Sequence, residues 1–193
     1  MEPRLKEAEE GKRKVYFVDA AHCVWCAYLG YLWCITRLFI PSPAGRKRYN
    51  ILGALDAITQ ELITITNEGY INSCTIRQLI DLVVLKGIKI PITLILDNAK
   101  YQRCKFVQDY AESKGVELLF LPSYSPNLNI IERLWKWVKK DCLYSKYYDK
   151  FDKFQLAIDK SLEKINNQID REETGDLFNL NFQDFSNAQI KTV

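Results

Sequence analysis

The stretch Ile92-Thr93-Leu94-Ile95-Leu96-Asp97-Asn98 is a short apolar run that ends abruptly in an acid and an amide. Because it follows Pro91 and is too short for a typical helix, it predicts a buried strand of an α/β sheet. Asp97 would then lie at the carboxyl end of that strand, where open α/β sheets tend to place ligand sites. The alternative is structural, since Asp97 and Asn98 would also suit a turn that caps the next helix.

The bulk composition predicts one globular domain with a substantial core. The chain has 193 residues, of which 48% are hydrophobic and 26% charged, and its net charge of +3 is too small to indicate a nucleic-acid partner by itself. No secretory signal or bilayer-length apolar stretch is found, so we expect a cytoplasmic protein without a membrane partner. The six cysteines are irregularly spaced; His22 and a Cys23-x-x-Cys26 pair lack the second half of a zinc site.

Other apolar runs predict a mixed sheet with helices packed on it, that is, an α/β fold. The first strand is expected at residues 15–18 and ends in Asp19; Asp56, within a later hairpin, is a rival candidate acid. A charged lead-in (1–14) precedes the expected main domain (15–145), and a C-terminal helix and tail (146–193) follow it. Further strands are expected at 50–58, 61–67 and 116–121, and helices near 72–86, 102–114 and 153–167.

An amphipathic helix is predicted after the turn at residues 124–127, because apolar residues recur there at helical spacing. Glu132 lies in its first turn at the edge of the apolar stripe, and Trp135 belongs to the stripe, so we expect it in the core. The structural alternative for Glu132 is a capping box, since Asn129-x-x-Glu132 fits that pattern. The stripe consists of Ile131, Leu134, Trp135, Val138 and Cys142.

Three acids therefore stand out: Asp19 on the first strand, Asp97 at the end of a later strand and Glu132 at the start of a helix. If the two strands are neighbours, a helix packed across them would bring the acids together. Converging carboxylates repel one another unless divalent cations lie between them, and oxygen ligands favour Mg²⁺ or Mn²⁺ over zinc. Two such ions can activate a water or a 3′-hydroxyl for attack on a phosphodiester.

The sequence resembles the catalytic domain of DDE transposases of the Tc/mariner superfamily, in the branch of bacterial insertion sequences. The motifs that carry the resemblance are 15–22, ending in Asp19-Ala20-Ala21-His22, then Leu96-Asp97-Asn98-Ala99, and the block of residues 121–135. That block, Leu-Pro-x-Tyr-Ser-Pro-x-Leu-Asn-x-Ile-Glu, is the most specific of the three. The separation between Asp97 and Glu132 is the one for which this branch is named.

The resemblance implies a ribonuclease H-like fold with a mixed five-stranded sheet flanked by helices. It implies that Asp19, Asp97 and Glu132 are the catalytic and metal-binding residues, with two Mg²⁺ ions that Mn²⁺ may replace. Its expected partners are DNA, as element ends and target DNA, and a second copy of the full-length protein, in a nucleoid-associated setting. Supporting roles are implied for Asn98, Tyr124, Ser125 and Asn129.

Backbone contacts to DNA are expected from clustered cations, because phosphate contacts come chiefly from lysine and arginine. These cations are Arg46, Lys47, Arg48, Arg133, Lys136, Lys139 and Lys140.

The sequence departs from the family pattern in two respects. Gln102 stands near the place where many relatives have a histidine. A full transposase of this family has an amino-terminal helix-turn-helix region that is not recognised in this sequence, so we expect the chain to be the catalytic half of such a protein.

The leading hypothesis is thus a metal-dependent DNA endonuclease and strand-transfer enzyme. A second hypothesis is an inactive DNA-binding or oligomerisation remnant that keeps the fold. A third is a ribonuclease H-like nuclease acting on hybrids or junctions, which the same three acids would serve.

Overall fold

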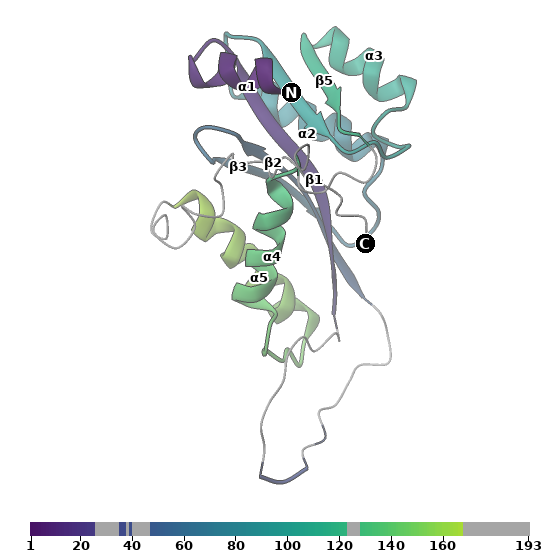
Figure 1. The fold of residues 1–193 in the computed structure, drawn as a ribbon. Coiled ribbons are helices and arrows are strands. Elements are labelled where there is room, and N and C mark those ends of the chain that lie inside the picture. Colours follow the sequence, from purple (N-terminus) through teal and green to yellow (C-terminus); the bar gives the residue numbers. More distant parts are fainter. Residues whose placement is uncertain (26–34, 38, 40–46, 123–127, 168–193) are drawn as a thin grey trace, which may run out of the picture.

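The computed structural model describes residues 1–25, 35–37, 39, 47–122 and 128–167. A mixed sheet lies at its centre, made of β1 (Lys14–Val24), β2 (Arg48–Asp56), β3 (Leu62–Asn67), β4 (Ile92–Leu96) and β5 (Val116–Phe120). The strand order is β3-β2-β1-β4-β5 (Figure 1). β1 runs antiparallel to β2 and parallel to β4, β3 is antiparallel to β2, and β5 is parallel to β4. The predicted five-stranded mixed sheet is confirmed.

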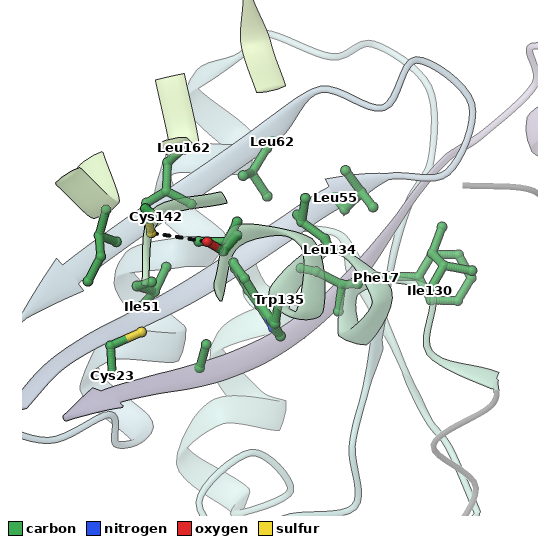
Figure 2. Close-up of a cluster of buried hydrophobic side chains, with 14 of the residues drawn as sticks. Phe17, Cys23, Ile51, Leu55, Leu62, Ile130, Leu134, Trp135, Cys142 and Leu162 are labelled. Atoms are coloured by element: carbon green, nitrogen blue, oxygen red, sulfur yellow. Dashed lines mark hydrogen bonds between the residues drawn. The ribbon is translucent and has the colours of Figure 1, made fainter. Parts of the chain in front are cut away.

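Helices cover both faces of the sheet. They are α1 (Glu2–Glu9), α2 (Ser73–Leu85), α3 (Lys105–Ser113), α4 (Ile131–Cys142) and α5 (Phe151–Asn166). Buried side chains of α2 and α3 pack against one face, and those of α1, α4 and α5 against the other, where Leu134 and Trp135 of α4 lie over the strands (Figure 2). No helix in the described part of the chain is long and apolar enough to cross a membrane.

Local sequence explains where several elements begin and end. Asn72 caps α2, its side chain accepting hydrogen bonds from the backbone N–H groups of Cys74 and Thr75. Gly87 and Gly115, with φ of +66° and +68°, follow α2 and α3 and adopt the left-handed conformation that favours glycine. All five residues of β4 are buried, as its uninterrupted apolar run predicts.

The register of the central strands determines where the candidate acids lie. Val18 of β1 is opposite Leu96 of β4, so the residues that follow, Asp19 and Asp97, are neighbours. Side chains alternate between the faces of a strand. Val18 and Leu96 point into the α2–α3 side of the core, so Asp19 and Asp97 both point to the α4 side.

The first strand is longer than predicted. It was expected to end at Asp19, but β1 continues to Val24, which pairs with Arg48. Asp19 is therefore inside a strand, because β2 runs alongside and supplies backbone partners beyond the apolar run. Asp56, the rival acid, is fully buried near the other end of β2, where it pairs with Lys14 (2.7 Å) and accepts hydrogen bonds from the turn that follows. Asp56 is a structural residue.

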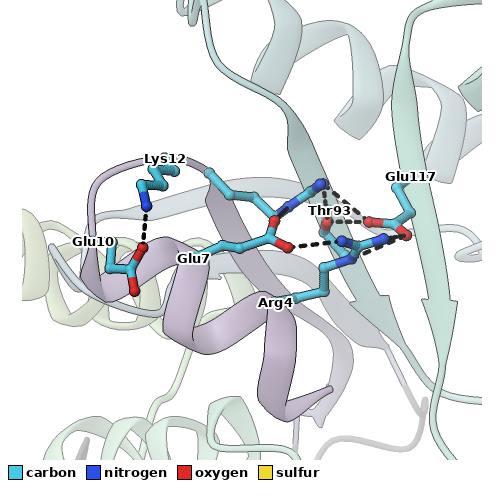
Figure 3. A network of polar contacts seen from close by, with 7 residues as sticks. Arg4, Glu7, Glu10, Lys12, Thr93 and Glu117 are labelled. Carbon is cyan, nitrogen blue, oxygen red and sulfur yellow. Dashed lines mark hydrogen bonds and ion pairs between the residues drawn. The ribbon is translucent and has the colours of Figure 1, made fainter.

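The charged lead-in over residues 1–14 contains a helix, α1, that is not solvated on all sides. Its residues Leu5 and Ala8 are buried in the core on the α4 side. A polar network then joins this region to β4 and β5 (Figure 3). Arg4 and Arg13 reach the two carboxylate oxygens of Glu117 at 2.8 and 3.0 Å, and the Thr93 hydroxyl donates to Glu117 at 2.6 Å. α1 is thus anchored on the sheet.

The C-terminal helix also belongs to this core. Phe151, Phe154, Ile158 and Leu162 of α5 are buried with side chains of α4 and the sheet. The tail from residue 168 onward lies outside the described residues, and the boundaries of a catalytic unit at residues 15 and 145 stay a prediction.

Candidate active site

Helix α4 brings Glu132 to the strands that carry the two aspartates. Leu134 and Val138 bury the apolar stripe on the sheet, which confirms the predicted amphipathic helix. The structural alternative, a capping box, is wrong: the N-cap is Ile130 and no side chain caps the helix. The Asn129 side chain instead donates to the carbonyl oxygen of Val18 at 3.3 Å and to Oδ1 of Asp97 at 3.4 Å. It bridges β1 and the acid at the end of β4.

The three acids influence one another electrostatically. Burial and the negative charge of Asp97 raise the pKa of Asp19 to about 7, and Glu132 adds a smaller effect. Burial and the charge of Asp97 also raise the pKa of Glu132, while Lys136 opposes the rise. Crowding of this kind is typical of functional carboxylates, because each negative charge disfavours ionisation of the next.

A pocket of about 340 Å³ lies beside Asp19 and Glu132. Lys136 and Lys139 line it on the α4 side, so cations surround a site that also holds two acids. The indole N–H of Trp135, another lining residue, donates to Oδ2 of Asp19 at 3.1 Å. Trp135 is only 5% exposed, which confirms its place in the core, but its contact with Asp19 was not predicted.

The donor chemistry of this site fits a hard divalent cation. The three carboxylates offer oxygen atoms, the ligand type that Mg²⁺ and Mn²⁺ prefer. The amide nitrogen of Asn129 faces Asp97, and its amide oxygen is buried without a hydrogen-bond partner among the described residues. Among the described residues, no three Asp, Glu, His or Cys side chains are close enough together to hold a metal ion. Asp19 and Asp97 are adjacent by strand register and interact directly, whereas Glu132 acts on them through its charge.

Two neighbours of the acids have buried polar groups. Gln102, only 1% exposed, lies in the segment between β4 and α3, and neither polar atom of its side chain makes a well-formed hydrogen bond. Burial and the charges of Asp19 and Asp97 raise the pKa of the Tyr101 phenol, which places that residue near both carboxylates. Tyr101 was missed because nothing in its local sequence marks it.

The remaining predicted residues lie in several places. Asn98 accepts a hydrogen bond from Arg103 at 3.3 Å, and its support of Asp97 stays a prediction. Lys47 and Arg48 line a second pocket, of about 380 Å³, together with the exposed Tyr70. Arg133 and Lys140 are on α4 with Lys136 and Lys139. Arg46, Tyr124 and Ser125 lie outside the described residues.

Known structures share this fold. Mos1 transposase in its strand transfer complex has a TM-score of 0.59 at 16% identity, covering 92% of this chain and 55% of that chain. The Mos1 paired-end complex with the left transposon end gives 0.57 at 15% identity, with 89% and 57% covered. The Mos1 catalytic domain with raltegravir and Mg gives 0.55 at 16% identity, with 86% of each chain covered. The chain therefore spans little more than half of the Mos1 chains in the first two structures.

The likeness to these structures establishes the ribonuclease H-like fold, and comparison of the sequence itself establishes the family. No curated protein matches the sequence. The profile of the DDE superfamily endonuclease family matches residues 14–155, which include all three candidate acids. Since that match covers well over half of the sequence, the chain belongs to the DDE superfamily endonuclease family.

Proposed function

We propose that the chain is the catalytic part of an insertion-sequence transposase, which cleaves DNA strands and transfers them in a metal-dependent reaction. The observation that carries the proposal is the juxtaposition of Asp19 and Asp97 on the α4 side of the sheet, with Glu132 within electrostatic range of both. Membership of the DDE superfamily endonucleases supports it.

The proposed metal ligands are Asp19, Asp97 and Glu132, which would hold two Mg²⁺ or Mn²⁺ ions. Bound ions of this kind activate a water or 3′-hydroxyl nucleophile and stabilise the leaving oxygen of a phosphodiester. Asn129 orients the Asp97 carboxylate through its amide N–H. Glu132 completes the site by a small approach of its side chain, because its long side chain has several rotatable bonds. The similar Mos1 catalytic domain has been solved with Mn and with Mg, which supports this choice of ions.

The proposed partner is DNA, both as element ends and as target. Lys136 and Lys139 border the pocket that Asp19 and Glu132 also line, and there they would contact backbone phosphates of bound DNA. Lys47 and Arg48, with Tyr70 beside them, offer a second basic surface where a base could stack. The similar Mos1 structures are a paired-end complex with the left transposon end and a strand transfer complex, which supports DNA ends as substrates. We also propose a homodimer for the full-length protein and a nucleoid-associated location.

An inactive remnant that only binds DNA is the second candidate. It is favoured by the spacing of the acids, since no three Asp, Glu, His or Cys side chains among the described residues are close enough together to hold a metal ion. The intact set of three acids favours the active enzyme instead.

Incubation with supercoiled plasmid DNA carrying candidate element ends separates these possibilities. We expect nicking in Mg²⁺ or Mn²⁺, none in EDTA, and none with Asp97→Asn. The matched control is Asp109→Asn, which neutralises an exposed acid on α3, on the other face of the sheet. DNA binding without cleavage in either ion would favour the remnant, and preferential cutting of the RNA strand in an RNA–DNA hybrid would favour a ribonuclease.

A further inference from the structure

A glycine lies directly across from the first candidate acid. Gly53 of β2 is the cross-strand partner of Asp19 in the antiparallel pair β1–β2. A Cβ atom added at Gly53 would lie 2.6 Å from Cη2 and 2.8 Å from Cζ2 of Trp135, and 3.1 Å from Cδ1 of Ile131. Carbon atoms that are not bonded do not approach so closely, because their attraction is best near 3.5–4.0 Å. Only glycine leaves room for the indole ring at this position.

The ring that fills this space contacts the acid itself. Trp135 Nε1 donates to Oδ2 of Asp19 at 3.1 Å. An indole N–H is a donor only, so it can bind a carboxylate oxygen but cannot compete with that oxygen for a cation. The bond to Trp135 goes to one carboxylate oxygen and not to Oδ1. Torsion about the bond to a carboxylate is broad, so fixed donors orient the group, and Trp135 shares this task with the backbone hydrogen bond from Ala20.

The same ring also determines the position of the third acid. Trp135 follows Glu132 by three residues on α4, a spacing that puts both side chains on neighbouring parts of one helix face. How deeply the indole enters the space above Gly53 therefore sets how closely the first turn of α4 approaches β1. One contact links the orientation of Asp19 to the location of Glu132.

We propose that Gly53 and Trp135 act together as a positioning unit, which orients the Asp19 carboxylate and sets the distance from Glu132 to the metal site. This inference rests on the proposed function, because the unit serves a site that binds divalent cations. Neither residue is catalytic, since both act through the acids.

Mn²⁺ binding measured by calorimetry on the purified full chain tests the consequence. Trp135→Phe removes the N–H donor and Gly53→Ala displaces the ring, so each is expected to weaken Mn²⁺ binding by about 10- to 100-fold, as for other residues that orient metal ligands. The double variant should be little weaker than Trp135→Phe alone, because a phenyl ring lacks the two indole carbons nearest the new methyl group, and only the longer contact with Cδ1 of Ile131 at 3.1 Å remains. Trp137→Phe, on the same helix, is the matched control and should bind as the unchanged protein does.

A second measurement separates the hydrogen bond from packing. Replacement of Trp135 by its benzothienyl analogue keeps the ring shape but puts sulfur in place of N–H, and it should weaken Mn²⁺ binding while leaving the urea midpoint near that of the unchanged protein. In the ¹H–¹⁵N spectrum, the Trp135 indole resonance should move with Asp19→Asn and on addition of Mg²⁺, whereas that of Trp137 should not.

The outcomes distinguish the two proposals. Unchanged Mn²⁺ affinity in folded Trp135→Phe, Gly53→Ala and the benzothienyl variant would overturn the positioning role alone. Absence of Mn²⁺ binding by the unchanged chain, or binding that Asp97→Asn does not weaken, would overturn the proposed function and the positioning role with it.

Discussion

Replacement of Asp19 by asparagine is expected to stabilise the metal-free protein at pH 8, although it removes a proposed metal ligand. In the folded chain, burial and the neighbouring Asp97 carboxylate raise the pKa of Asp19 from its ordinary value of 3.8 to about 7. The folded protein therefore binds a proton that the unfolded chain has already released between these values. The free energy of unfolding must then fall as the pH rises through this range.

The magnitude follows from the size of the pKa change. Each pKa unit corresponds to about 1.4 kcal/mol, so ionisation of Asp19 lowers the free energy of unfolding by up to about 4 kcal/mol at pH 8 and by less than about 2 kcal/mol at pH 5. Asparagine has nearly the same shape and no charge. Its stabilising effect should therefore be large at pH 8 and small at pH 5.

Urea unfolding in EDTA, followed by circular dichroism at both pH values, measures this effect. Asp109→Asn serves as the control, because it removes an exposed charge from α3 and should change stability little at either pH. Added Mg²⁺ should stabilise the unchanged protein at pH 8 but not Asp19→Asn. A destabilising effect of Asp19→Asn at pH 8, or an equal effect at both pH values, would show that the carboxylates are not crowded and would refute the reasoning.

Three further substitutions test the scaffold and the proposed DNA surface. Gly115→Ala should lower the free energy of unfolding by about 1 kcal/mol, because alanine is strained at a φ of +68°, whereas Gly69→Ala, in open space, should not; urea titration checks both. Arg13→Met should cost about 1 kcal/mol by the same assay, since its guanidinium is 12% exposed and bonded to Glu117, while Lys12→Met, at 70% exposure, should cost almost nothing. Lys136→Ala should reduce the slope of log affinity against log salt by about 1 in DNA-binding titrations, and an unchanged slope would place this lysine away from phosphate.

Much of the fold followed from local patterns. Short stretches of sequence were enough to predict the apolar run of β4, the amphipathic stripe of α4 and the glycines that end α2 and α3. The length of β1 was missed because residues 20–24 are small or polar apart from Val24 and are held in the sheet by pairing with β2. Burial of Leu5 and Ala8 was missed because α1 carries few apolar residues, and its partners lie far along the chain.

Some residues of the site were predicted and others were not, again because local sequence does not show which distant residues a side chain contacts. The two aspartates follow from strand ends and register, but the resemblance to a family was needed to single out Glu132, since its local pattern fits a helix cap equally well. Asn129 fits that cap pattern too, yet its side chain turns to Asp97. Periodicity places Trp135 in the core without saying which atom its N–H meets. Gly53 did carry a signal, because an isolated glycine within a strand often marks close approach by another group.

Because the two aspartates lie on or directly after the adjacent strands β1 and β4, the sheet fixes the distance between their backbones. Both strands are interior members of the sheet, each hydrogen-bonded on two sides, and adjacent strands are held about 4.7–4.9 Å apart. The spacing between the backbones that carry Asp19 and Asp97 is therefore as invariant as the sheet itself. Glu132, which lies on helix α4, is then the acid that would move to fit ions of different radius or the geometry of successive chemical steps.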